Sequence, residues 1–188
     1  MNYEERKMKK NSMYGFCLNE QNHTSANTSI NKTRIPTAFT KVKPYGHVCD
    51  YGCGKYTDHI KKWCQSEGCL SYNPYDKYNQ DENTNERTMY VGQKHGYDTI
   101  YCCNVLNVID SDNEIWKILH DMYNMLLNHS KLIIQIYEGN KTGNGCESKF
   151  DCYQRNEKVH GYTRFFGAFQ GRPFKYEIKG NIIIVTKL

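Results

Sequence analysis

The sequence lacks any long apolar run, and this absence limits where the protein can work. No stretch approaches the roughly 18 consecutive apolar residues that a membrane-spanning helix needs. The first ten residues, MNYEERKMKK, contain no apolar core of the kind that a secretory signal requires. We therefore expect a cytoplasmic protein with no membrane association.

The chain also lacks a Cys-x-x-Cys pair, although it contains nine cysteines. An odd number of cysteines without paired spacing argues against a disulfide framework and against a zinc ribbon. Cys49, Cys102 and Cys103 stand inside apolar runs, where cysteine behaves as a small hydrophobic residue. We expect no metal site, and the spacing of Cys49 and Cys53 leaves one as the lesser alternative.

Extended basic runs are absent as well. The net charge of +5 permits a polyanionic partner but does not require one. A chain of 188 residues has room for one domain around a single core. We expect residues 1–24 to form a polar N-terminal arm and residues 25–188 to form a single domain.

From residue 47 onward, strand signals and helix signals alternate along the chain. Strands are expected at 47–51, 69–73, 98–104 and 131–138, with a weak one at 88–91. Helices are expected at 55–66, 112–128 and 155–167, a loop at 74–87, and a glycine-rich loop between the strand at 131–138 and the helix at 155–167. The last residues read as two strands around the turn Lys179-Gly180-Asn181. This order predicts an α/β fold with a doubly wound, mostly parallel sheet and a C-terminal antiparallel hairpin.

The segment VCDYGCGKYTDHI, residues 48–60, carries the strongest functional signal. Apolar residues lead into Asp50, and Gly52 and Gly54 follow at once. Glycine allows a tight turn that a ligand can approach closely, and ligands of such sheets bind at the carboxyl ends of strands. Neither a P-loop nor the dinucleotide fingerprint fits, because no Gly-Lys-Ser/Thr follows and Thr57 occupies the third glycine position. The acid suits a ligand that carries a positive group; a tight turn without a ligand is the alternative.

These residues resemble a known family. VCDYGCGKYTDHI resembles motif I of the class I S-adenosylmethionine-dependent methyltransferases, YNPYD at 72–76 resembles the end of their second strand, and DTIYCCNVLNVID at 98–110 is similar to their motif IV. The segments TSINKTRIP, IIQIYEGNKTGNG, DCYQRNEKVHGY and GNIIIVTK look like a subset of small methyltransferases from phages and bacterial mobile elements. The resemblance covers residues 25–188. It implies a Rossmann-like fold, S-adenosylmethionine as cofactor, and the host cytoplasm as location if the protein is phage-encoded.

The resemblance also implies a set of cofactor contacts. Arg34 could meet the cofactor carboxylate as a bidentate donor, although an ordinary surface arginine is the alternative. The other contacts that it implies are Asp50, Gly52, Gly54, Asn73, Asn104 and Val105.

Two positions depart from the family pattern. Tyr56 replaces the third glycine of motif I, and Asn73 replaces the acid that binds the ribose hydroxyls. Asparagine still forms hydrogen bonds to a hydroxyl, but without the strength of a carboxylate. Asp76 is the alternative ribose ligand.

Three residues are predicted to shape methyl transfer. Asn104 and Asn107 can hydrogen-bond a substrate amide or base, and Glu138 is the candidate general base. A turn cap is the alternative for Asn107, and a solvated carboxylate is the alternative for Glu138. The end of the fourth strand lacks the paired prolines of amino-methylating DNA enzymes, and the chain has no Pro-Cys for a cytosine C5 nucleophile.

Two classes of function follow from these observations. The first is methyl transfer from S-adenosylmethionine to a nucleic acid, a nucleotide or another small acceptor. The alternative is a non-catalytic protein of methyltransferase fold that binds or consumes S-adenosylmethionine as a partner subunit or counter-defence factor. Basic and aromatic residues interleave over 140–175, a composition that permits nucleic-acid contact. The sequence carries no signal for the oligomeric state.

Overall fold

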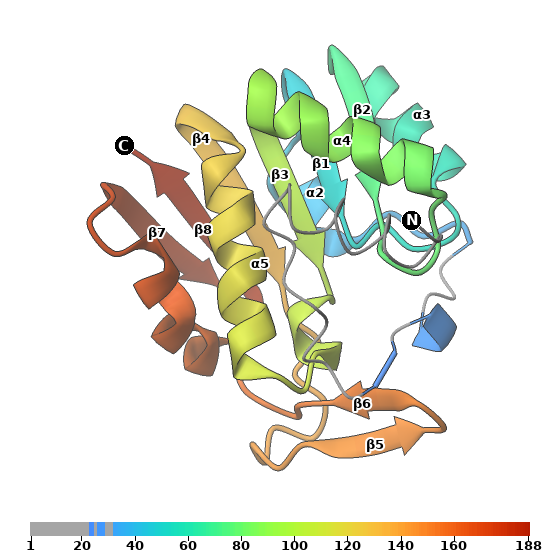
Figure 1. The fold of residues 1–188 in the computed structure, drawn as a ribbon, viewed down its shortest axis with the longest axis vertical. Helices are drawn as coiled ribbons and strands as arrows, with labels where there is room; N and C mark the ends of the chain where they lie inside the picture. Colours follow the sequence, from blue (N-terminus) through green and yellow to red (C-terminus); the bar gives the residue numbers. More distant parts are fainter. Residues whose placement is uncertain (1–22, 25, 29–31) are drawn as a thin grey trace, which may run out of the picture.

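The computed structural model describes residues 23–24, 26–28 and 32–188 (Figure 1). The polar arm expected at 1–24 lies outside the described residues except for its last two. A short 3₁₀ helix, η1 (Ala26–Thr28), precedes the main body. Thr24 donates from its backbone N–H and its hydroxyl to the carboxylate of Asp151, at 3.1 and 2.6 Å. This contact ties the N-terminal part of the described chain to the last third of the sequence.

A six-stranded sheet forms the centre of the protein. Its strands are β1 (His47–Tyr51), β2 (Ser71–Tyr75), β3 (Tyr97–Cys103), β4 (Leu126–Gln135), β7 (Phe174–Lys179) and β8 (Ile182–Lys187). They lie in the order β2-β1-β3-β4-β8-β7. The first four are parallel, and β8 runs antiparallel to both β4 and β7. The predicted mostly parallel sheet with a C-terminal antiparallel hairpin is confirmed.

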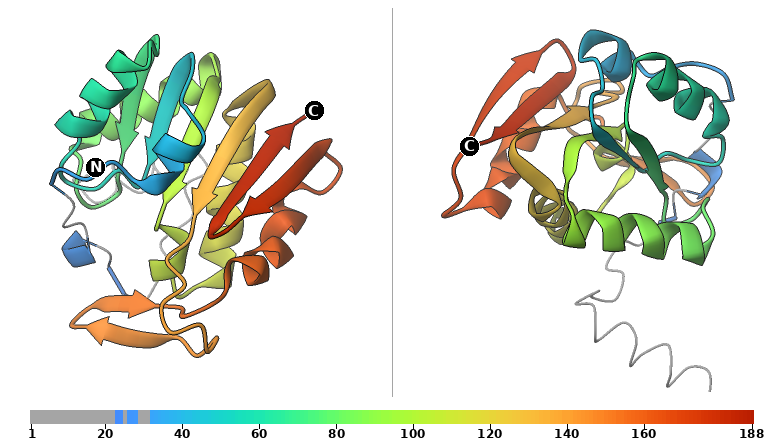
Figure 2. Two further views of the ribbon diagram at one scale, coloured as in Figure 1. Left: turned by 180° about the vertical axis from the view of Figure 1, so that it is seen from behind. Right: turned by 90° about the horizontal axis from the view of Figure 1, so that it is seen from above.

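Helices cover both faces of this sheet, as Figures 1 and 2 show. The elements are α2 (Thr37–Lys41) and α3 (Asp58–Ser66) on one face, and α4 (Glu82–Lys94), α5 (Asp112–Asn124) and the 3₁₀ helix η3 (Val159–Phe169) on the other. Side chains alternate between the two faces along a strand. Cys49 and Tyr51 of β1 therefore pack against the core under α4 and α5, while Val48 belongs to the core under α2 and α3.

The region between β2 and β3 differs from its prediction. The loop expected at 74–87 is present only over 76–81, and the weak strand expected at 88–91 is wrong, because α4 spans Glu82–Lys94. Asp81 is the N-cap of this helix, and its carboxylate accepts a hydrogen bond from the Thr84 N–H at 2.9 Å. The helix buries only Thr88, Met89 and Gly92, so its apolar face is too sparse to give a clear periodic signal.

The second strand begins two residues later than expected. It was expected at 69–73, with Pro74 closing it, but β2 includes Pro74 and ends at Tyr75. Proline lacks the N–H that an inner strand would use for a neighbour, so it is tolerated on an edge strand. The sheet order places β2 at the edge of the sheet.

A small hairpin stands beyond the carboxyl ends of the parallel strands (Figures 1 and 2). It consists of β5 (Cys146–Lys149) and β6 (Cys152–Gln154), within a stretch that was expected to be a glycine-rich loop. The helix expected at 155–167 is instead the 3₁₀ helix η3, which begins at Val159.

Among the helices of the described residues, none has the length and apolar character that a membrane-spanning segment requires.

Candidate functional site

The candidate site is centred on the glycine turn, residues 50–56, which connects β1 to α3. Gly52 and Gly54 both have positive φ values, of 79° and 75°, in the left-handed region that favours glycine. The backbone N–H groups of Gly52 and Cys53 both donate to the carbonyl of Tyr75, at 2.7 and 3.1 Å. The sharp turn that the two glycines predicted is present, and the end of β2 holds it in place.

Gly52 is also required by its neighbour across the sheet. A Cβ atom placed on Gly52 would lie 2.2 Å from Cγ2 of Val105, well inside van der Waals contact. Val105 follows β3, so the turn after β1 and the exit from β3 touch at this point. The structure thus brings together Gly52 and Val105, which the sequence had assigned to the same site.

Asp50 is the buried acid of the turn. The residue is 4% exposed, and its Oδ2 accepts a hydrogen bond from the Tyr72 hydroxyl at 2.8 Å. Burial raises the pKa of Asp50 to about 7; the Tyr72 hydrogen bond opposes this rise, and the negative charge of Asp76 adds to it. No cation is among the causes of this shift within the described part of the chain. Asp50 is therefore a carboxyl group that a positive ligand would convert fully to its ionised form.

Asp76 fixes the turn from the other side. Its Oδ2 accepts from the Gly54 N–H at 2.9 Å, and its Oδ1 accepts from the N–H groups of Tyr78 and Asn79 at 3.0 and 2.9 Å. Its backbone is held in turn by the Asn85 side chain, through bonds of 3.0 and 2.9 Å. A carboxylate that accepts this many N–H bonds is already satisfied within the protein. Asp76 thus supports the turn, and its oxygens are less available for a ribose.

Asn73 lies inside β2 rather than at its end. It pairs with Cys49 in the sheet register. Its side-chain amide donates to the Val48 carbonyl at 3.1 Å and to the Ser71 hydroxyl at 2.8 Å. The amide is therefore engaged with its own edge of the sheet, which makes Asn73 a weaker candidate for cofactor contact than its match to the family pattern suggested.

Asn104 stands at the end of β3 in a position suited to ligand contact. Its φ is +59°, and its side chain is exposed. Its N–H donates to the Gln135 carbonyl at 2.8 Å, which anchors it to the end of β4. The left-handed backbone turns the chain sharply after the strand, and asparagine tolerates this conformation better than most residues. Val105 lies against Gly52, and Asn104 precedes it at the exit from β3.

The segment that contains Arg34 runs beside the start of α3. The Arg34 carbonyl contacts Nε2 of His59 at 3.2 Å, and the Lys32 ammonium lies 5.5 Å from the centre of the Tyr56 ring. Lys55 lies 5.9 Å from the same ring centre. Arg34 thus lies beside the start of α3, and Lys32, two residues before it, reaches the end of the glycine turn at Tyr56. Tyr56 is surrounded by cations at the position where the family has its third glycine.

Asn107 is buried and joins two segments. It lies in the 3₁₀ helix η2 (Leu106–Val108), and its amide donates to Oε1 of Gln154 at 3.0 Å. Its carbonyl accepts the Arg155 N–H at 2.9 Å. These bonds attach the β5–β6 hairpin to the exit from β3. The observed contacts of Asn107 are thus those of a connecting residue, close to the alternative that the sequence left open.

Glu138 is occupied by its neighbours. Its Oε1 accepts the Val159 N–H at 2.8 Å, at the start of η3, and its Oε2 pairs with Nζ of Lys141 at 3.0 Å. The Val159 hydrogen bond, followed by that of Lys141, lowers the pKa of Glu138. A general base works best with a pKa near the working pH. The environment of Glu138 moves its pKa away from that range.

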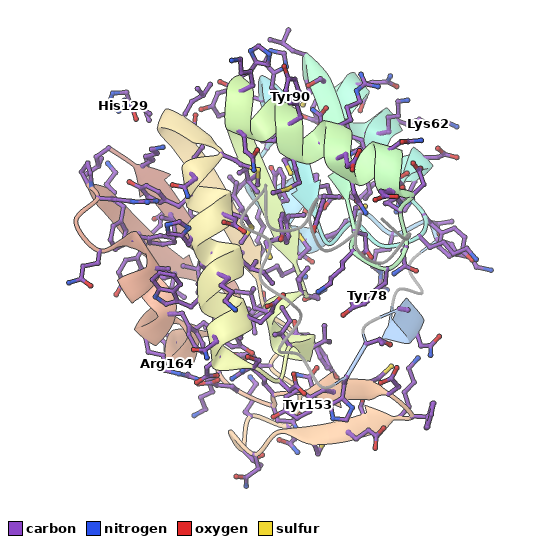
Figure 3. All side chains as sticks on the ribbon, viewed as in Figure 1. Lys62, Tyr78, Tyr90, His129, Tyr153 and Arg164 are labelled. Atoms are coloured by element: carbon purple, nitrogen blue, oxygen red, sulfur yellow. The ribbon has the colours of Figure 1, made fainter. Side chains whose placement is uncertain are left out.

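Sequence reasoning did not identify two of the supporting residues. Tyr72 holds Asp50, and the Gln80 side chain donates to the Gly54 carbonyl at 2.7 Å. No local spacing connects either residue to the turn: Tyr72 reaches it because β2 pairs with β1, and Gln80 reaches it from the loop between β2 and α4. Figure 3 shows Tyr78, from the loop after β2, and Tyr153, from β6, on the carboxyl side of the sheet. The Tyr153 ring stacks on His23 with 5.9 Å between ring centres.

Comparison with known proteins gives matches of structure only. No protein-family model matches the chain, and no curated protein matches its sequence. A solved 1,6-didemethyltoxoflavin-N1-methyltransferase from Burkholderia thailandensis, with S-adenosylhomocysteine bound, matches with a TM-score of 0.54 and 13% identity, over 79% of this chain and 72% of that one. An S-adenosylmethionine-bound amino pentose methyltransferase from Micromonospora echinaspora matches with a TM-score of 0.50 and 9% identity, over 80% and 87%. An S-adenosylmethionine-dependent methyltransferase from Methanosarcina mazei matches with a TM-score of 0.50 and 12% identity, over 83% and 99%.

These matches concern the arrangement of the backbone. At 9 to 13% identity they identify the fold and leave the reaction to be argued from the site. The fold of this chain is that of class I S-adenosylmethionine-dependent methyltransferases.

Proposed function

We propose that the protein binds S-adenosylmethionine at the glycine turn and transfers its methyl group to a small acceptor or nucleotide. The observation that carries this proposal is the surroundings of Asp50. Asp50 is buried, accepts a hydrogen bond from the Tyr72 phenol and lies near the acid Asp76, and no cation is among the causes of its pKa shift. Such a carboxyl group suits a ligand that brings a positive charge. The amino group and the sulfonium of S-adenosylmethionine are two such charges.

The residues of the turn fit the cofactor in shape as well as charge. Gly52 and Gly54 leave the main chain open to close approach, and α3 begins at Asp58, four positions after Gly54, without a side-chain cap on its N-terminus. Asn104 and Val105 would line the side towards β3, and Arg34 would approach from the segment beside α3. We assign Asn73 a lesser place in this set, because its amide is engaged on the edge of the sheet.

The bound cofactor would supply an activated methyl group on its sulfur. The contribution of the chain is then to hold the acceptor in line and to exclude water, which can provide much of the rate of such a transfer. We place Asn104 at the acceptor because it is exposed at the end of β3. We assign no proton transfer to Glu138, since both of its oxygens are occupied.

The charged residues of the C-terminal third favour a small acceptor over a long nucleic acid. Nη2 of Arg155 pairs with Oδ1 of Asp112 at 2.7 Å, and Nη2 of Arg164 pairs with Oε2 of Glu157 at 3.0 Å. Cations held in this way contribute less to phosphate binding than cations that meet the phosphate unpaired. The hairpin β5–β6 stands where it would cover an acceptor at the carboxyl edge.

A second function is favoured by one observation. Glu138 and Asn107, two of the three predicted catalytic residues, are engaged in holding η3 and the hairpin. A protein that binds or consumes S-adenosylmethionine without transferring its methyl group would have no need of them at the acceptor. This function includes a counter-defence role in the host cytoplasm, if the resemblance to phage and mobile-element proteins reflects the origin of the chain.

The first test is calorimetric titration of the purified protein with S-adenosylmethionine and with S-adenosylhomocysteine. We expect both to bind with micromolar dissociation constants, followed by methylation of one member of a panel of nucleotides, nucleobases and small amines. Binding without any methylated product would favour the second function. No binding to a folded protein would contradict both.

A further inference from the structure

The hydrogen bond between Tyr72 and Asp50 joins two adjacent strands on the side of the sheet that faces α3. Tyr72 of β2 pairs with Val48 of β1, two residues before Asp50. Because side chains alternate along a strand, Val48 and Asp50 point to the same face. Tyr72 packs against the core on that face, and its hydroxyl reaches Oδ2 of Asp50 at 2.8 Å. The ring fixes where the hydroxyl lies, so the carboxyl group is held in one orientation.

The surroundings of Asp50 leave its charge unbalanced. In the described part of the chain, the ionisable groups that interact electrostatically with Asp50 are cysteine thiols, tyrosine phenols and one carboxylate. They are Cys49, Cys53, Cys64, Cys102 and Cys103, together with Tyr72, Tyr101 and Asp76. The thiols and phenols are neutral near pH 7, and burial raises their pKa values further. Asp76 is the only charged member, and it repels a negative Asp50. The phenol of Tyr72 is thus the only one of these groups that favours the ionised form of Asp50.

We propose that Tyr72 is a positioning residue for Asp50, and that binding of a cationic ligand at the glycine turn releases the proton that Asp50 carries in the ligand-free protein. This inference rests on the proposed function for the identity of the ligand. In the ligand-free protein Asp50 exchanges its proton with solvent. When the ammonium or sulfonium group arrives, the carboxylate remains ionised, the Tyr72 hydroxyl still donates to it, and one proton goes to the buffer.

Two consequences can be measured. The pKa of Asp50 in the free protein is about 7, so the apparent affinity should rise about tenfold per pH unit below that value and level off above it. Replacing Tyr72 by phenylalanine keeps the ring in the core but removes the donor. The midpoint of the pH profile should then move upwards by roughly one unit, because a hydrogen bond to a charged group is worth about that much.

The experiment is isothermal titration calorimetry with S-adenosylhomocysteine as the probe, from about pH 5.5 to about pH 8.5. At each pH, two buffers with different heats of ionisation report how many protons are released. Wild type should release close to one proton well below the midpoint and none well above it. The matched control is Tyr123→Phe in α5, which packs on the other face of the sheet from Tyr72. This change removes a phenol that donates to the Pro173 carbonyl at 2.8 Å. The control should keep the wild-type midpoint.

A Tyr72→Phe protein with the same midpoint and the same proton release as wild type would overturn the inference. A merely structural role for Tyr72 would weaken binding equally at every pH and would also count against it. If neither S-adenosylmethionine nor S-adenosylhomocysteine binds at any pH, the proposed function fails. The effect of Tyr72 on Asp50 is then measured in the ligand-free protein. In that case carbon-13 NMR of labelled aspartate should still give a titration of Asp50 near pH 7 that moves upwards in Tyr72→Phe, and an unmoved titration would refute the contact.

Discussion

Two carboxyl groups, one at the end of a parallel strand and one just beyond another, have surroundings that give them opposite properties. Asp50, at the end of β1, is buried with one phenol donor, and its pKa is raised to about 7. Glu138, beyond β4, accepts the Val159 N–H and pairs with Lys141, and its pKa is lowered. Glu138 has its partners within the protein, whereas no cation of the described residues contributes to the pKa shift of Asp50, so a cationic ligand would stabilise its ionised form. The comparison supports the proposal that the ligand binds at the glycine turn, while the contacts of Glu138 are those of a residue that holds the start of η3.

The largest expected effect on cofactor binding comes from closing the space beside the turn. Gly52→Ala places a Cβ 2.2 Å from Val105 Cγ2 at a φ of +79°, so both collision and backbone strain oppose it. We expect the free energy of unfolding to fall by about 3 kcal/mol and cofactor binding to be lost. Chemical denaturation and calorimetry measure the two effects.

Two further variants separate the two causes. Gly180→Ala introduces backbone strain without a collision, because φ is +63° and nothing lies within 4 Å of the added Cβ. This variant should lose about 1 kcal/mol of unfolding free energy. The double variant Gly52→Ala/Val105→Ala should recover the part that is due to collision. If the double variant is no more stable than the single one, the contact with Val105 does not limit the turn.

The second prediction concerns Asp50, whose carboxyl group is expected to favour ligand binding while lowering the stability of the free protein as pH rises. The pKa of Asp50 is raised from 3.8 to about 7, so the folded state binds a proton that the unfolded state has lost between about pH 4 and pH 7. The stability of the free wild type should therefore decrease as pH rises through this window, by up to about 4 kcal/mol from this group. Asp50→Asn removes this decrease, and it should weaken S-adenosylhomocysteine binding at least tenfold. Denaturation curves at pH 5 and pH 8 check the sign; a larger loss of stability with pH in the variant than in wild type would contradict it.

The third prediction concerns the support of the turn by Asp76. Asp76→Asn replaces one acceptor oxygen by an NH₂ group that faces backbone donors, so either Gly54 or the Tyr78–Asn79 pair loses its partner. We expect a loss of about 2 kcal/mol in unfolding free energy and weaker, but still measurable, cofactor binding. Full binding with unchanged stability would mean that the turn does not depend on this carboxylate.

The smallest effect is expected at Glu138. In Glu138→Gln the remaining oxygen can still accept the Val159 N–H, and the lost ion pair with Lys141 lies near the surface. We expect at most about 0.5 kcal/mol of lost stability, with cofactor affinity and methyl-transfer turnover unchanged. A fall in turnover of about a hundredfold or more, with binding intact, would restore Glu138 as the general base. The contrast drawn between Glu138 and Asp50 would then be wrong.

The sequence and the structure agree best where a local pattern suffices. The strand at 47–51, the two glycines and the final hairpin were each predicted from residues adjacent in the chain. Prediction failed at α4, where a polar stretch forms a helix because Asp81 caps it and a few side chains pack on the sheet. It failed also at β5 and β6, two short strands that were read as loop.

The candidate site divides in the same way. The sequence by itself determined that an acid and two glycines form a turn after a buried strand, because those residue types fix local backbone conformation and its place in a parallel sheet. Only the tertiary structure decided which polar groups are satisfied within the protein. Hydrogen-bond partners such as Tyr72 for Asp50 and Val159 for Glu138 lie 22 and 21 positions away in the chain, and folding alone brings them together.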